Sequence, residues 1–209
     1  MKPRYLIGID EVGRGPLAGP VAVCALVLKI SGKKTLPKTL KRKTFDSKQI
    51  SPAEREVWYK KICLERDAGT LDFCVTFISA KIIDTKGLSF AIRSALEKSL
   101  ATVVGRANNP KKIKPTNFQI LLDGGLKAPA EFINQKTIIK GDAKEAVIGL
   151  ASIAAKVTRD RLMTRLAKKY PHYDLATHKG YGTRAHIKAI RQHGPSPIHR
   201  RSFLAKISP

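Results

Sequence analysis

The segment Tyr5-Leu-Ile-Gly-Ile-Asp-Glu-Val-Gly-Arg-Gly-Pro-Leu-Ala-Gly-Pro20 joins an apolar run to a glycine-rich loop through two adjacent acids. The apolar run predicts a buried strand, and the glycines allow the loop backbone to approach another group closely. Asp10 and Glu11 lie at the end of this strand, where two neighbouring carboxylates repel each other unless a cation or a proton intervenes. A divalent metal ion is the first explanation to consider.

The composition indicates a globular protein with an anionic partner. The 209 residues are 43% hydrophobic and include 40 Lys and Arg against 16 Asp and Glu, a formal charge of +24. This length is enough to bury a sizeable core. The charge favours a nucleic acid, because phosphate contacts release counterions. The alternatives are a solubilising surface or an anionic membrane, but no amphipathic Lys/Trp helix is present.

Cysteine usage and the first residues bear on the compartment. Cys24, Cys63 and Cys74 match no zinc spacing, and an odd number of cysteines forms no closed disulfide set. The start of the sequence lacks the apolar core of a signal peptide, and no run of eighteen apolar residues occurs. We therefore expect a cytoplasmic protein that does not associate with membranes.

Hydrophobic periodicity predicts alternating strands and helices. Predicted strands cover residues 5–10, 21–30, 70–78, 118–123 and 136–140, and predicted helices cover 51–68, 89–104, 143–170 and 185–193. The first two strands are expected to pair antiparallel. Basic surface loops are predicted at 31–44 and 105–116, and a turn at 84–88. The alternation indicates an α/β fold, a mixed sheet with helices on its faces, and no linker separates two domains.

Four acids follow a common pattern. Asp10, Glu11 and Asp123 lie at the ends of apolar strands, and Asp142 lies just before a predicted helix. If the two strands are parallel neighbours, Asp10 and Asp123 lie side by side at the carboxyl end of the sheet. Carboxylates without a His or Cys cluster suit Mg²⁺ or Mn²⁺, and two such ions catalyse phosphodiester hydrolysis.

Each candidate also has a purely structural interpretation. Asp142-Ala-Lys-Glu145 forms a capping box, Asp123 precedes a Gly-Gly turn, and Glu11 is interpretable as a solvated loop residue. The glycine loop alone is a weak signal for a phosphate cradle. Near the C-terminus, glycines, cations and Tyr181 suit phosphates and a stacking ring, the alternative being a packed loop with Tyr181 in the core.

The segment Ile9-Asp-Glu-Val-Gly-Arg-Gly-Pro-Leu-Ala-Gly-Pro-Val21 resembles the opening signature of ribonuclease HII, in the style of the bacterial branch. Further matching segments follow in the same order along the chain, up to residue 203. These segments are Asp46-Ser-Lys48, Leu122-Asp-Gly124, Lys140-Gly-Asp142, Ala151-Ser-Ile-Ala-Ala-Lys-Val-Thr-Arg-Asp160, Tyr170-Pro171, His178-Lys-Gly-Tyr-Gly-Thr183 and Ile198-His-Arg-Arg-Ser-Phe203.

This resemblance implies a ribonuclease H-like fold, with a mixed five-stranded sheet flanked by helices and a helical and loop C-terminal extension. Residues 1–209 would form one catalytic domain, whose substrate-binding extension covers about 170–209. The implied activity is a metal-dependent endonuclease that hydrolyses the RNA strand of RNA–DNA hybrids. It would also cut 5′ of single ribonucleotides embedded in duplex DNA, leaving 3′-hydroxyl and 5′-phosphate ends through two Mg²⁺ or Mn²⁺ ions.

The resemblance also implies residue roles. The catalytic, metal-binding carboxylates would be Asp10, Glu11, Asp123 and Asp142. The substrate-binding residues would be Gly13, Arg14, Gly15, Lys48 and Tyr181; residues 13–15 would read the 2′-hydroxyl through backbone groups, and Tyr181 would stack on the sugar at the RNA–DNA junction. We expect a monomer.

The sequence departs from the family pattern in its basic loops, 31–44 and 105–116, which look longer than usual. Gly149-Leu150 also replaces the usual small alanines, and no C-terminal clamp-binding segment is identified. Two rival functions are a non-catalytic RNA-binding protein of the ribosomal kind and a nuclease that requires several consecutive ribonucleotides.

Overall fold

The structure is a computed structural model that describes residues 3–30, 36–40, 50–107 and 113–205. Its centre is a five-stranded sheet with the order β3-β2-β1-β4-β5. The strands are β1 (Tyr5–Val12), β2 (Val21–Lys29), β3 (Leu71–Ile78), β4 (Phe118–Asp123) and β5 (Gln135–Ile138). β1 pairs antiparallel with β2 and parallel with β4, which confirms the predicted mixed sheet and its first hairpin.

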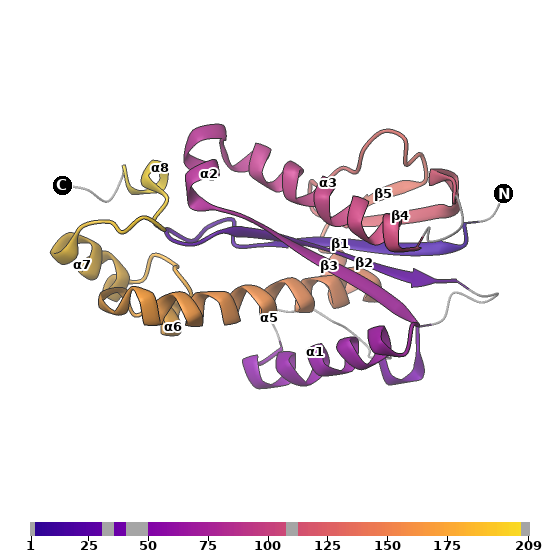
Figure 1. Cartoon of the computed structure of the whole chain (residues 1–209), viewed down its shortest axis with the longest axis horizontal. Helices are drawn as coiled ribbons and strands as arrows, with labels where there is room; N and C mark the ends of the chain where they lie inside the picture. The colour runs from indigo at the N-terminus through magenta and orange to yellow at the C-terminus, as the bar shows by residue number, and fades with distance from the viewer. Residues whose placement is uncertain (1–2, 31–35, 41–49, 108–112, 206–209) are drawn as a thin grey trace.

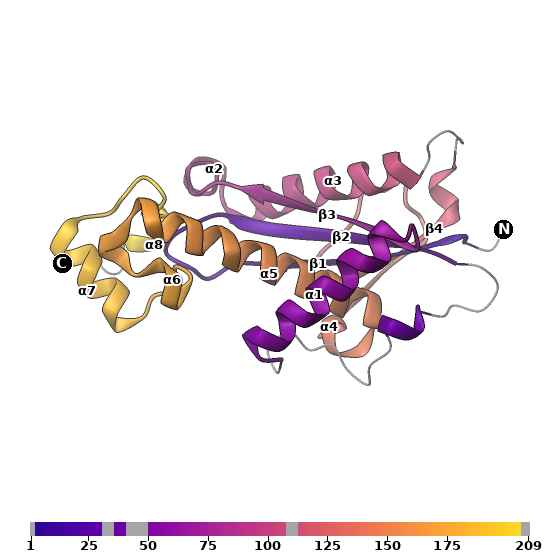
Figure 2. The same cartoon turned by 60° about the horizontal axis from the view of Figure 1, so that its bottom comes forward.

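Helices cover both faces of the sheet (Figures 1 and 2). One face carries α2 (Ala80–Lys86) and α3 (Leu88–Ala107), and the other carries α1 (Pro52–Asp67) and α5 (Ala146–Lys169). Eight of the nine residues of β2 are buried, as expected for a strand covered on both faces. Separate apolar cores fill the two interfaces.

A glycine in the first strand sets the distance to the longest helix. A Cβ atom on Gly8 would lie 2.3 Å from the carbonyl oxygen of Val147 in the first turn of α5. Only glycine permits this approach without a shift of the backbone. The close packing places α5 directly beneath the strand that carries Asp10.

The C-terminal segment lies beyond the carboxyl end of β1 (Figure 1). It contains three short helices, α6 (Leu175–His178), α7 (Arg184–His193) and α8 (Arg201–Leu204). A third core joins this segment to the glycine loop and includes Leu17 and Met163. The Leu17 amide donates to the carbonyl of Gly180 at 2.8 Å, so the loop is fixed by residues far along the chain.

Local signals set several element ends. Ser51 caps α1 by accepting the Glu54 amide at 3.2 Å, and Pro52 occupies the first turn, as predicted. The turn predicted at 84–88 begins too early, because Asp84 lies within α2, which ends at Lys86 with Gly87 as its C-cap. The helix α3 runs three residues past its predicted end.

Two further expectations need correction. The helix predicted from residue 143 begins at Ala146, after the separate short helix α4 (Gly141–Lys144). Leu40, in the predicted surface loop 31–44, is fully buried, because it packs in the same core as Trp58 and Ile62. The rest of that loop outside 36–40, and residues 108–112, lie outside the described residues. Among the helices that are described, none combines the length and apolarity needed to cross a bilayer.

Candidate active site

One pocket of about 460 Å³ lies at the carboxyl ends of β1 and β4. It is lined by Asp10, Glu11, Val12, Gly13, Arg14, Gly15, Arg55, Asp123, Asp142, Ser152, Lys156 and Tyr181. The pocket therefore brings together every predicted site residue except Lys48, which falls outside the described residues.

The sheet register aligns the first pair of acids. Ile9 of β1 lies opposite Leu122 of the parallel strand β4, so the next residues, Asp10 and Asp123, follow side by side. This arrangement confirms the placement expected from two apolar strands that each end in a carboxylate. It puts both carboxyl groups at the carboxyl ends of these strands, where α/β proteins build their sites.

Asp142 reaches the same pocket through a hydrogen-bonded turn. The Asp123 carboxylate accepts the Gly141 amide at 2.6 Å, and Lys140 adopts a left-handed backbone with φ of 55°. Such a conformation in a non-glycine residue is strained, and strained residues cluster at functional sites. Asp142 does not cap the long helix, whose N-cap position is Glu145, so the capping-box interpretation is wrong.

Burial controls the charge of Asp10. Its residue is only 5% exposed, and burial raises the pKa of this carboxyl to about 8, with repulsion from Glu11 and Asp123 adding to the effect. A hydrogen bond with Ser152 opposes the shift. At neutral pH the group is therefore mostly protonated, unless a cation takes the place of the proton.

Glu11 is held at the pocket wall rather than in solvent. Its side chain is 11% exposed, and Oε1 accepts a hydrogen bond from Arg14 at 3.0 Å. Burial raises the pKa of the carboxyl, and the interaction with Arg14 opposes the increase. The other oxygen, Oε2, is buried and has no hydrogen-bond partner in the part of the chain that the structure describes. The interpretation of Glu11 as a solvated loop residue is therefore wrong.

Three polar residues of the pocket, Arg55, Ser152 and Lys156, were not among the predicted site residues. Ser152 and Lys156 lie four apart on α5 and so share one face of the helix, a spacing that offered a signal. Lys156 donates to Asp160 at 2.8 Å, and burial lowers the pKa of its ammonium group. Arg55 comes from α1 and donates to the carbonyl of Ile50, and nothing in its local sequence pointed to the pocket.

The loop glycines contact different groups. Gly13 has φ of +89°, and a Cβ there would lie 2.4 Å from the Arg159 Nε atom. Gly15 instead faces the pocket, where the nearest atom to an added Cβ is Tyr181 Cε1, at 4.0 Å. Gly13 is therefore needed for packing inside the protein, and Gly15 leaves space beside an aromatic ring.

Tyr181 stands at the pocket with 41% of its surface exposed. The alternative in which its ring belongs to the core is wrong. Its backbone carbonyl accepts the Thr183 amide at 2.8 Å and contacts the His186 ring nitrogen Nδ1 at 2.9 Å. The backbone is thus anchored while the ring remains available for stacking.

The donor chemistry of the pocket fits a hard divalent cation. Four carboxylates can supply oxygen ligands, and the buried Oε2 atom of Glu11 has no hydrogen-bond partner among the described residues. As they lie, no three His, Cys, Asp or Glu side chains in the described ranges are arranged to hold an ion. Gathering these oxygens around a cation therefore requires side-chain rotations, beginning with carboxylates now occupied by the Gly141 amide and by Arg14.

Comparisons with known proteins identify the family of the chain. The family model described as Ribonuclease HII matches residues 7–206. A ribonuclease HII from Clostridium beijerinckii is 42% identical over 204 residues, covering 98% of this chain and 69% of the relative. One from Endomicrobium trichonymphae is 40% identical over 197 residues, covering 94% and 83%.

A solved structure leads to the same family. The crystal structure of the ribonuclease H2 from Pyrococcus horikoshii OT3 superposes with a TM-score of 0.64 at 28% identity, covering 97% of this chain and 96% of that one. The ribonuclease H-like fold expected from the sequence is therefore confirmed. With a family model matching nearly the whole chain and relatives this similar, the chain belongs to the ribonuclease HII family and is an endonuclease of ribonuclease H type 2.

Proposed function

We propose that this chain hydrolyses the RNA strand of RNA–DNA hybrids and also cuts on the 5′ side of single ribonucleotides embedded in duplex DNA. The products would carry 3′-hydroxyl and 5′-phosphate ends. The observation that carries this proposal is the single pocket shared by four carboxylates, the glycine loop and Tyr181. A phosphate beside the carboxylates and the neighbouring ribose beside the loop can then be bound together.

Asp10, Glu11, Asp123 and Asp142 are the residues that would hold Mg²⁺ or Mn²⁺. When bound, two such ions activate a water molecule and stabilise the leaving oxygen of a phosphodiester. The Asp10 carboxyl, whose pKa is raised to about 8, must release its proton to act as a ligand. Metal affinity is therefore expected to increase with pH across the neutral range.

The loop and the ring supply the recognition of the ribose. RNA differs from DNA by the 2′-hydroxyl, which is both a donor and an acceptor. The amides of Arg14 and Gly15 form no hydrogen bond to any described part of the chain, so they are free to donate to a ligand. The Tyr181 ring faces Gly15 across the pocket and offers a surface for stacking on the next sugar.

Two cations of the pocket are suited to the phosphates. Lys156 and Arg55 both line it, and phosphate contacts fix the register of a nucleic acid without reading its sequence. Arg14 neutralises Glu11 until a substrate or an ion competes for either group.

The proposal also covers the domain organisation of the chain, its cellular compartment and its oligomeric state. Residues 1–209 would form one domain, in which the segment from about 170 acts as a substrate-binding extension; Tyr181 belongs to that segment and reaches the pocket. The free thiols Cys24, Cys63 and Cys74 support a reducing cytoplasmic location. A monomer is the expected state in solution.

The decisive experiment compares three duplexes of one sequence: an RNA–DNA hybrid, a DNA duplex with one ribonucleotide, and DNA alone, each with Mg²⁺ and Mn²⁺. Cleavage of the first two, with the cut of the second mapped to the 5′ side of the ribonucleotide, supports the proposal. Cleavage of the hybrid alone would favour the rival nuclease that needs several consecutive ribonucleotides. No cleavage of either would refute the proposed substrates.

A further inference from the structure

Two arginines are buried behind the glycine loop, and the chemistry of the pocket does not use them. Arg159 of α5 and Arg200, just before α8, are each 0% exposed. They are the largest fully buried side chains among the described residues. Buried charge is costly, so two such groups in one place call for a physical account.

Arg159 binds the loop from the helix side. Its Nε atom donates to the carbonyl of Pro20 at 2.9 Å, and one terminal nitrogen donates to Ala18 at 3.3 Å. The other terminal nitrogen donates to the carbonyl of Lys179 at 3.1 Å, two residues before Tyr181. One guanidinium group thus joins the loop to the segment that carries the exposed ring.

Arg200 binds the same loop from the C-terminal segment. Its Nε atom donates to Gly19 at 3.0 Å, and its terminal nitrogens donate to the carbonyls of Arg14 at 2.9 Å and Gly13 at 2.7 Å. Together the two groups bind five of the eight carbonyl oxygens in residues 13–20. In a trans peptide the amide points away from the preceding carbonyl, so the amides of residues 14 and 15 point away from Arg200. Both residues line the pocket.

The glycines of the loop make room for this arrangement. An added Cβ at Gly13 would lie 2.4 Å from Arg159 Nε. One at Gly19 would lie 2.4 Å from Met163 Sδ and 3.4 Å from an Arg159 terminal nitrogen. Both glycines have positive φ, a conformation that other residues rarely adopt. Gly13 therefore serves the contact with a guanidinium group, and Gly19 serves the contact with Met163.

The pair also leaves positive charge behind the loop. Neither guanidinium group forms an ion pair with a carboxylate in the part of the chain that is described. Burial, and then repulsion from Arg159, lower the pKa of Arg200 to about 9, so the group stays charged at neutral pH. In a poorly solvated site, this charge favours an anion in front of the loop.

We propose that Arg159 and Arg200 are positioning residues for ribose recognition, which hold the loop amides toward the 2′-hydroxyl and, by their charge, favour the adjacent phosphate. This inference rests on the proposed function of the loop. It assigns the pre-organisation of the loop to two residues distant in sequence, which contact the loop through its carbonyl oxygens. Neither residue is expected to touch the substrate.

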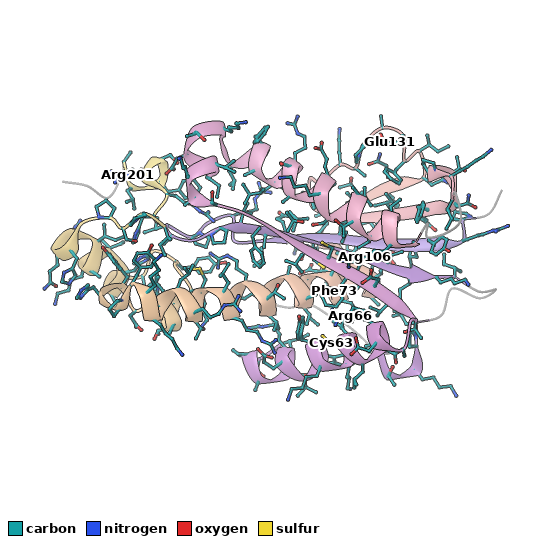
Figure 3. The ribbon with its side chains drawn as sticks, in the orientation of Figure 1. Cys63, Arg66, Phe73, Arg106, Glu131 and Arg201 are labelled. Atoms are coloured by element: carbon teal, nitrogen blue, oxygen red, sulfur yellow. The ribbon has the colours of Figure 1, made fainter. Side chains whose placement is uncertain are left out.

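The test uses Arg200→Lys and Arg159→Lys, which keep the charge but lose the fork that binds several carbonyls at once. The matched control is Arg106→Lys. Arg106 is exposed on α3 and forms an ion pair with Asp72. It lies far from Arg201 of the C-terminal segment (Figure 3). For each protein, kcat/KM is measured on the duplex with one ribonucleotide, and Kd is measured on the DNA duplex of the same sequence without metal.

We expect Arg159→Lys and Arg200→Lys each to lower kcat/KM at least about tenfold. The Kd for plain DNA should change less than about twofold, because the charge is kept. Hydrogen exchange should accelerate at the bonded loop amides of Leu17, Ala18 and Gly19, while exchange in β2 stays slow. The control should match the wild type in every measurement.

Three outcomes overturn the inference. The first is a folded Lys variant with kcat/KM within twofold of the wild type, and the second is an equal loss of plain-DNA binding. The third is global unfolding of both Lys variants, which would make the pair part of the core rather than of recognition. Failure of the wild type to cut the one-ribonucleotide duplex would refute the proposed function instead.

Discussion

The Nε2 atoms of His186 and His199 lie 3.0 Å apart, and both rings are buried. His186 Nδ1 lies 2.9 Å from the carbonyl of Tyr181, an oxygen that can only accept, so this nitrogen carries a proton. His199 Nδ1 accepts the Ser196 amide at 3.0 Å, so its proton is on Nε2 and is donated to His186. Two neutral rings in fixed tautomers thus connect Ser196 to the backbone of Tyr181.

This chain of hydrogen bonds predicts an acid-sensitive stability. Burial, with repulsion from His186, lowers the pKa of His199 to about 4, and burial lowers that of His186 as well. Tyr173 and His178 also face this pair of rings. Between about pH 6.5 and pH 4 the unfolded state binds more protons than the folded state, so stability decreases as pH falls through this window.

The measurement is the free energy of unfolding in urea at pH 7 and pH 5 for the wild type and His199→Gln. We expect the variant to lose less stability between the two pH values, by on the order of 1 kcal/mol. His172→Gln is the control, because His172 is exposed and stacks on His193 at the surface. An identical pH dependence in all three proteins would show that His199 is not kept neutral by the fold.

The raised pKa of Asp10 predicts the opposite change of stability with pH. Its folded-state value of about 8 exceeds the ordinary 3.8, so the folded protein binds more protons between these values and loses stability as pH rises through them. Asp10→Asn removes this loss. We expect the variant to be more stable than the wild type by a few kcal/mol at pH 8, with a smaller difference at pH 5.

Substitutions that stabilise the metal-free protein at these acids should abolish its activity. Asp10→Asn and Asp123→Asn are each expected to reduce cleavage below detection, and added Mg²⁺ should stabilise them less than the wild type. Asp67→Asn, which alters an exposed acid paired with Arg66, is the control. Near wild-type turnover in either folded variant would remove that acid from the proposed metal-binding set.

The carboxylate pair was predictable because two short apolar runs each end in an acid, and parallel strands bring such ends together. In each strand, the apolar run and the acid that marks its end are adjacent in sequence, so a local pattern was enough. The short helix α2 was missed because Ser79 forms no side-chain cap and the helix has only seven residues, so its local signal is weak. Asp84 therefore looked like part of a turn.

The support of the glycine loop was out of reach for a different reason. Arg159 and Arg200 bind loop carbonyls that are 139 to 187 residues away in sequence, and neither local pattern marks a buried arginine. Arginine is ordinarily a surface residue. The glycines signalled a close approach, but the group that approaches Gly13 became identifiable only from the packing of α5.

Salt dependence offers a test of the path of the nucleic acid. Arg14 lines both the carboxylate pocket and a neighbouring groove of about 530 Å³, which also contains Arg93, Lys127 and Glu97. If a strand continues along this groove, the double variant Arg93→Glu/Lys127→Glu should reduce the slope of log K against log salt by about 2, because each phosphate contact contributes about 0.9.

The cleavage position should stay the same in this variant, since the carboxylate pocket is untouched. Lys60→Glu, on the exposed side of α1, controls for a change of overall charge. A slope equal to that of the wild type would show that the strand leaves the pocket in another direction.

The final prediction separates the reading of the hydroxyl from the reading of the junction. Gly15 has ordinary φ and space for a Cβ, so Gly15→Ala should fold with a Tm within about 2 °C of the wild type. The added methyl group would nevertheless occupy the space beside the Tyr181 ring where we place the ribose. We therefore expect kcat/KM to fall at least about tenfold on every substrate that contains ribonucleotides.

Tyr181→Ala should act differently, because it removes only the stacking surface. The ring is exposed, so stability should change little, and kcat/KM should fall mainly on the duplex with a single ribonucleotide, where the next sugar is a deoxyribose. The informative quantity is the ratio of kcat/KM on the all-RNA hybrid to that on the one-ribonucleotide duplex. A rise of about tenfold in Tyr181→Ala, with an unchanged ratio in Gly15→Ala, assigns junction reading to the ring. Equal losses on both substrates in Tyr181→Ala would place that discrimination elsewhere in the pocket.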